Sequence, residues 1–134
     1  DAGARDSAAV GGRGPVTPAE LERALLIADV PLAFPELKLV MSHLGDPWIS
    51  ETVAMLIKHP NVFAMTAGWA PKYIPEEILR FAERRNPGKL MWASDYPILP
   101  IERAVVEGRA VPLTGAAREG YLGANARKVF GHGL

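Results

Sequence analysis

The pattern of a buried strand is clearest in one stretch of this sequence, Leu90-Met91-Trp92-Ala93-Ser94-Asp95-Tyr96-Pro97. Five apolar or weakly polar residues run directly into an acidic one, which predicts a strand covered on both faces and followed by Asp95. Residues 37–42 repeat this pattern and run into His43. Ligands bind at the carboxyl ends of parallel strands, so both side chains are first candidates for chemistry. The alternative for Asp95 is that it caps the next helix.

Composition limits the classes of function. The chain has 134 residues, of which 49% are hydrophobic, as expected of one soluble globular domain. The 15 basic and 15 acidic residues balance, and no basic stripe is present, so nucleic acid is not an expected partner. Cysteine is absent, which excludes disulfides and thiolate metal sites. No apolar run has the length of a membrane span, and we expect no membrane association; the cytoplasm is the default compartment.

The first 16 residues differ from the remainder. They are rich in Ala, Gly, Arg and Ser without an apolar period, and the chain begins with Asp1 instead of Met. We therefore predict a leader or linker over residues 1–16 and a single α/β domain over residues 17–134. The opening also suggests that the sequence begins inside a longer reading frame.

Helical and strand patterns alternate along the domain. Thr17-Pro18-Ala19-Glu20 predicts a capped helix that ends near Pro31, and Asp46-Pro47 predicts the start of the next one. Strands are predicted at residues 37–42, 62–66 and 90–94, and helices at 17–30, 46–59, 75–85, 100–107, 114–122 and 125–130. Alternation of this kind indicates parallel strands joined by helical crossovers.

Several motifs resemble, in their order, the C-terminal part of the amidohydrolase-related family. This branch of the amidohydrolase superfamily includes metal-dependent hydrolases and non-oxidative decarboxylases such as aminocarboxymuconate semialdehyde decarboxylase. The resemblance covers roughly residues 30–131 and is carried by Met41-Ser42-His43-Leu44-Gly45-Asp46-Pro47-Trp48, by Trp92-Ala93-Ser94-Asp95-Tyr96-Pro97, by Phe34-Pro35-Glu36-Leu37-Lys38, by Lys58-His59-Pro60-Asn61-Val62-Phe63 and by Asn125-Ala126-Arg127-Lys128-Val129-Phe130-Gly131.

The resemblance implies a fold and a site. The fold is a (β/α)8 TIM barrel, of which the three strands resemble the sixth, seventh and eighth. Asp95 matches the aspartate of strand eight, which binds a divalent metal and orients the attacking water; the expected metal is zinc. His43 matches the histidine of strand six, a metal ligand or general acid/base. Trp48, Trp69 and Tyr96 lie on loops at the same face and are expected to line a small-molecule substrate pocket, or else to pack under those loops.

The departures from the family are equally informative. The His-x-His pair and the histidine of strand five are missing, so the chain offers at most two of the three protein ligands usual for catalytic zinc. Two interpretations follow. The chain is the C-terminal part of a metal-dependent hydrolase or decarboxylase, with weak or no metal binding by itself, or it is a non-catalytic half barrel that self-associates.

Three further expectations concern surfaces. His59 ends a helix and His132 lies in a glycine-flanked tail, and both are predicted to be solvated. An open sheet has two unpaired edges, which favours homo-oligomers. The face toward the barrel interior is expected to carry alternate residues from Leu39, Met41, Phe63, Met65, Met91 and Ala93 or their neighbours.

Overall fold

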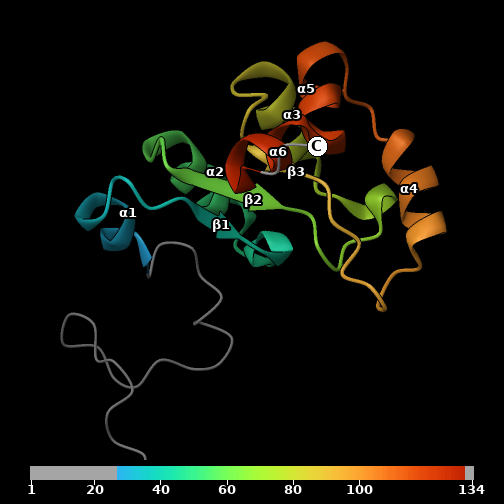
Figure 1. The fold of residues 1–134 in the computed structure, drawn as a ribbon, viewed down its shortest axis with the longest axis horizontal. Coiled ribbons are helices and arrows are strands. Elements are labelled where there is room, and N and C mark those ends of the chain that lie inside the picture. The colour runs from blue at the N-terminus through green and yellow to red at the C-terminus, as the bar shows by residue number, and fades with distance from the viewer. Residues whose placement is uncertain (1–26, 132–134) are drawn as a thin grey trace, which may run out of the picture.

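The computed structural model describes residues 27–131. Its sheet contains β1 (Leu39–Met41), β2 (Val62–Met65) and β3 (Leu90–Met91) in the order β1-β2-β3, as Figure 1 shows. Both strand pairs are parallel. The prediction of three parallel strands in chain order is therefore confirmed. The expected leader over residues 1–16, and most of the first expected helix, lie outside the described residues.

Helices connect the strands as the alternating pattern predicts. Within the described residues, one α-helix precedes β1, one lies in each crossover, and three follow β3. Their bounds are α1 (Asp29–Ala33), α2 (Ile49–Lys58), α3 (Glu76–Arg84), α4 (Ile101–Arg109), α5 (Gly115–Glu119) and α6 (Asn125–Phe130).

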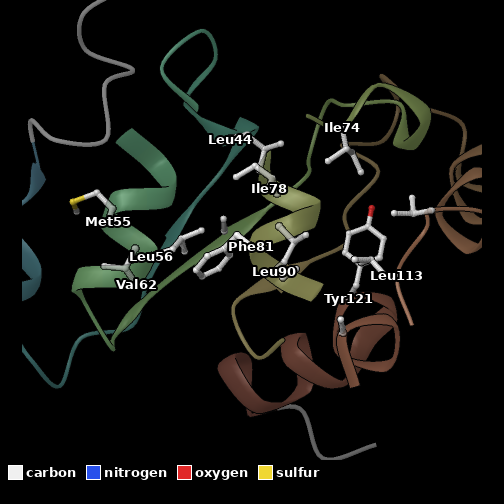
Figure 2. Close-up of a cluster of buried hydrophobic side chains, with 14 residues drawn as sticks. Leu44, Met55, Leu56, Val62, Ile74, Ile78, Phe81, Leu90, Leu113 and Tyr121 are labelled. Atoms are coloured by element: carbon white, nitrogen blue, oxygen red, sulfur yellow. The ribbon is translucent and has the colours of Figure 1, made fainter. Parts of the chain in front are cut away.

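The main core lies between one face of the sheet and the helices. Val62, Ala64 and Leu90 point to this face, because they occupy alternate or directly paired positions of the ladder. They pack with side chains from the helices, among them Leu56 of α2 and Phe81 of α3 (Figure 2). Apolar burial of this kind is the main force that holds the layers together.

The opposite face is the one that would look into a barrel. Phe63, Met65 and Met91 lie on it, as expected, because they alternate with the core residues. Leu39 and Met41, which are also among the residues expected on this face or beside it, lie on the core side instead: they pair with Val62 and Ala64 and pack against the helical core. Strands buried on both faces are apolar throughout, so the sequence does not distinguish the two sides.

The outer edge of β3 is closed by the chain itself. In a parallel ladder, successive residues direct their backbone groups to opposite edges. Lys89 and Met91 bond β2. The backbone groups of Leu90 and Trp92 therefore face outward. The Asn125 side chain donates to the Leu90 carbonyl at 2.8 Å, and the Trp92 N–H donates to the Tyr121 carbonyl at 2.9 Å. The expectation of two unpaired edges is therefore wrong for β3, because the C-terminal segment bonds the outward backbone groups of this strand.

Three expected helix boundaries are also corrected. Pro31 does not end a helix but lies in the first turn of α1, where its missing N–H is not needed. Pro47 precedes α2 instead of opening it, since α2 begins at Ile49. Thr114 precedes α5 without a side-chain capping bond, because its hydroxyl and N–H bond the Glu83 carboxylate. These bonds lower the pKa of Glu83.

A buried lysine joins the starting ends of two strands. Lys89 Nζ donates to the carbonyl groups of His59, Pro60 and Val62 at 2.6, 2.8 and 2.7 Å. Lys89 lies just before β3, and it thereby satisfies carbonyl groups at the end of α2 and at the start of β2. Burial lowers the pKa of Lys89 to about 8, so the side chain is mostly charged at neutral pH.

Lys89→Met should destabilise the chain more than the same substitution at a lysine in a more exposed position. Methionine fills a similar apolar volume but leaves three carbonyl groups without this donor, so we expect the free energy of unfolding to fall by about 3 kcal/mol at pH 7. Lys38 Nζ bonds only the Lys128 and Val129 carbonyls, so Lys38→Met should cost about 1 kcal/mol. Urea denaturation measures both, and equal losses would contradict this account of Lys89.

Candidate functional site

The ends of β1 and β3 bring His43 and Asp95 to the same edge of the sheet. His43 begins the turn that follows β1, and Asp95 lies on the loop that follows β3. The site is completed by the loop after β2, which contains Ala67 and Gly68. Three consecutive strand ends therefore supply the site, as expected where parallel strands end together.

The imidazole of His43 is fixed by one hydrogen bond. Its Nδ1 lies 3.0 Å from the carbonyl oxygen of Ala67. A carbonyl only accepts, so this bond requires the proton on Nδ1 and leaves Nε2 as the free lone pair in the neutral ring. A histidine that binds a metal or receives a proton through Nε2 is commonly oriented in this way.

Both candidate side chains lie close to Gly68. A Cβ atom at this position would lie 2.8 Å from His43 Nδ1 and 3.4 Å from Asp95 Oδ2. His43 Nδ1 and Asp95 Oδ2 are therefore separated by no more than the sum of these two distances. The backbone of Gly68 has φ +75°, which also favours glycine.

Left-handed backbone is concentrated at this site. His43, Leu44 and Asp95 have φ of 58°, 60° and 56°, and they are the described non-glycine residues with positive φ. Such a conformation costs about 1 to 2 kcal/mol per residue relative to right-handed backbone. Residues of this kind persist where the surroundings hold them, and they are frequent at active sites.

The expected aromatic residues have different positions. Tyr96 follows Asp95 and is 69% exposed. Trp69 lies on the loop after β2 and donates its indole N–H to the His43 carbonyl oxygen at 3.0 Å. Trp48 is half-buried at the start of α2, where its backbone N–H bonds the Gly45 carbonyl. Their expected contact with substrate remains a prediction.

Two histidines were expected to be solvated. That prediction is wrong for His59, which is 4% exposed because Lys89 and the start of β2 cover the end of α2. Its Nε2 atom is buried without a hydrogen-bond partner among residues 27–131. His59 lies where β2 begins, at the edge of the sheet opposite His43. His132 lies outside the described residues.

A divalent metal fits this site only in part. Asp95 offers a hard anionic oxygen and His43 a neutral nitrogen, which are suitable ligands for zinc. In the part of the chain that the structure describes, no group of three or more His, Cys, Asp or Glu side chains could hold a metal ion. The described residues therefore provide two donors, one fewer than the protein ligands of a typical catalytic zinc.

Comparison with known proteins identifies the family. The sequence model of the amidohydrolase family matches residues 12–132. The chain belongs to the amidohydrolase family. No curated protein matches it. Within the described residues, no helix combines the length and apolar character required to cross a membrane.

Solved structures of TIM-barrel proteins share the fold. An uncharacterised TIM-barrel protein from Bordetella bronchiseptica superposes with a TM-score of 0.77 and 21% identity, over 88% of this chain and 43% of its own. An amidohydrolase from Burkholderia multivorans with bound zinc gives 0.59 and 19%, over 82% and 50%. The 5-carboxyvanillate decarboxylase of Sphingomonas paucimobilis gives 0.53 and 23%, over 84% and 38%. The chain thus spans half or less of the length of these barrels.

Sequence reasoning did not identify Thr52, Ala67 and Gly68 as parts of this site. Ala67 acts through its backbone carbonyl, which no side-chain pattern reveals. Thr52 donates its hydroxyl to the Leu44 carbonyl from within an ordinary helical stripe. Only Gly68 carries a signal, since an isolated glycine just past a strand indicates close approach of other groups.

Gly68→Ala should displace the His43 imidazole. The added methyl group would lie 2.8 Å from Nδ1, so the ring must move away from the Ala67 carbonyl. Gly131→Ala is the control, because Gly131 has a similar φ of 68° with nothing within 4 Å of its Cβ position. Both variants should lose about 1 kcal/mol of stability. Only Gly68→Ala should shift the His43 ring resonances in NMR spectra; unchanged resonances would contradict the observed packing.

Proposed function

We propose that this chain forms the C-terminal part of the catalytic barrel of a metal-dependent hydrolase or non-oxidative decarboxylase that acts on a small-molecule substrate. The observation that carries this proposal is the placement of His43 and Asp95 beside Gly68, on strained backbone, at one end of parallel strands. Family membership supports it.

Each residue has a distinct role in this proposal. The Asp95 carboxylate supplies an anionic oxygen ligand, and His43 presents Nε2 as a further ligand or as a proton acceptor. If Nε2 accepts a proton, the Nδ1–H bond to Ala67 remains in place and keeps the ring oriented. A bound divalent metal would supply the positive charge that polarises the substrate or water.

Zinc is the metal that we propose. An amidohydrolase with the same fold contains bound zinc, and a nitrogen donor beside a carboxylate suits this ion. The two donors of this chain leave the coordination incomplete, so the missing ligands must come from outside the described residues. Complete zinc sites bind the ion with a free energy of roughly 10 kcal/mol or more. We therefore expect the 134-residue chain alone to bind zinc far more weakly than such sites do.

The decisive experiment uses the complete barrel. When the missing portion of the barrel is joined to this chain, zinc binding should become tight and turnover should appear. Asp95→Asn, which is nearly isosteric, should then lower the rate by at least about 1,000-fold because it removes the anionic ligand. His43→Asn should lower the rate more than the metal content if His43 carries a proton, and lower both if it is a ligand. Full activity of Asp95→Asn with unchanged metal content would overturn the proposal.

The alternative is a non-catalytic half barrel that forms homo-oligomers. One observation favours it: Val40 of β1 directs its backbone N–H and C=O to the outer edge, because Leu39 and Met41 face β2. This edge is flanked in sequence by Leu32, Phe34 and Leu37, which are exposed. No other strand among residues 27–131 pairs with this edge, and exposed apolar side chains beside such an edge favour association.

Sedimentation of the isolated chain tests this alternative. If β1 edges pair, the chain should dimerise, and Val40→Pro should shift the equilibrium toward monomer by removing the outward N–H. The ladder to β2 loses no donor in this variant. A concentration-independent monomer in both proteins would remove the support for self-association.

A further inference from the structure

The turn that carries His43 depends on donors from elsewhere in the chain. His43, Leu44 and Gly45 have φ of 58°, 60° and 68°, so three consecutive residues are left-handed. Each of their carbonyl groups accepts a hydrogen bond from a different donor: the Trp69 indole, the Thr52 hydroxyl and the Trp48 backbone N–H, at 3.0, 2.8 and 2.8 Å.

We propose that Trp69 and Thr52 are positioning residues, which hold the strained turn so that His43 presents Nε2 to the site. This inference rests on the proposed function of His43 and adds to it. It also gives Trp69 a role that does not depend on contact with substrate.

Trp69 acts from the same loop that orients the imidazole. The Ala67 carbonyl accepts the Nδ1–H of His43, and two residues later the Trp69 indole donates to the His43 carbonyl. One loop therefore holds the histidine at its ring and at its backbone. The ring cannot rotate without breaking the Nδ1–H bond to Ala67, and the backbone of His43 cannot turn without breaking the bond from Trp69.

Thr52 acts from α2, on the buried side of the turn. Its side chain is fully buried, and its hydroxyl is the donor that the Leu44 carbonyl receives. The Leu44 side chain is itself fully buried among the core residues labelled in Figure 2. The turn is thus anchored to the core on one side of His43 and to the loop after β2 on the other.

The test measures the tautomer of His43 in the 134-residue chain by long-range ¹H–¹⁵N NMR at a pH where the ring is neutral. In the unaltered chain the Nδ1–H form should predominate. Trp69→Phe keeps an aromatic ring but removes the indole donor, so the ratio of Nδ1–H to Nε2–H forms should fall at least about threefold.

Trp92→Phe is the matched control. It makes the same chemical change at an indole whose N–H is buried without a hydrogen-bond partner among the described residues. The His43 tautomer should be unaffected in this variant. An equal effect of Trp92→Phe and Trp69→Phe would overturn the inference, because the change would then not arise from the bond to His43.

Thr52 provides a second, independent test. Thr52→Val is nearly isosteric but removes the hydroxyl, so it should lower the Nδ1–H fraction, and Thr52→Ser should restore it. If Thr52→Val and Trp69→Phe both leave the tautomer unchanged, the inference is wrong. Neither measurement requires metal, substrate or the remaining barrel, so its failure is distinguishable from failure of the Asp95→Asn experiment.

Discussion

The parallel pairing of β2 with both neighbours is the constraint on which the remainder of the structure depends. It brings the carboxyl ends of β1, β2 and β3 together at one end of the sheet, where His43, Gly68 and Asp95 meet. At the opposite end of the strands, Lys89 donates hydrogen bonds to the carbonyl groups where α2 ends and β2 begins. The buried lysine and the candidate site thus lie at opposite ends of the same short sheet, and in TIM barrels these two ends serve stability and catalysis respectively.

The two outer edges of the sheet are not equivalent. Asn125 and Tyr121 bond the outward groups of β3, whereas no residue in the described range 27–131 pairs with the outward groups of Val40 in β1. Tyr121 also contributes its ring to the core and its hydroxyl to Thr66 at 3.1 Å, and burial raises the pKa of this phenol to about 12. The C-terminal segment therefore closes the β3 side of the sheet.

Strain at the site is balanced by hydrogen bonds that come from distant elements. The left-handed residues at His43 and Leu44 would relax in an isolated peptide, because right-handed or extended backbone is lower in energy. Donors from α2 and from the loop after β2 hold them in the folded chain. The geometry of the histidine is in this sense a property of three segments, none of which fixes it alone.

The sequence by itself determined the local elements and the two candidate residues, because apolar periodicity reports strands and helices, and a polar residue after a buried strand reports a site. Position along the chain could not report the burial of His59, the bond from Trp69 to His43 or the closure of β3 by Asn125. Each of these depends on a partner more than 20 residues away. Only the tertiary structure brings such donors and acceptors within 3 Å or so, and so only it decided which polar groups are satisfied and which are left free for chemistry.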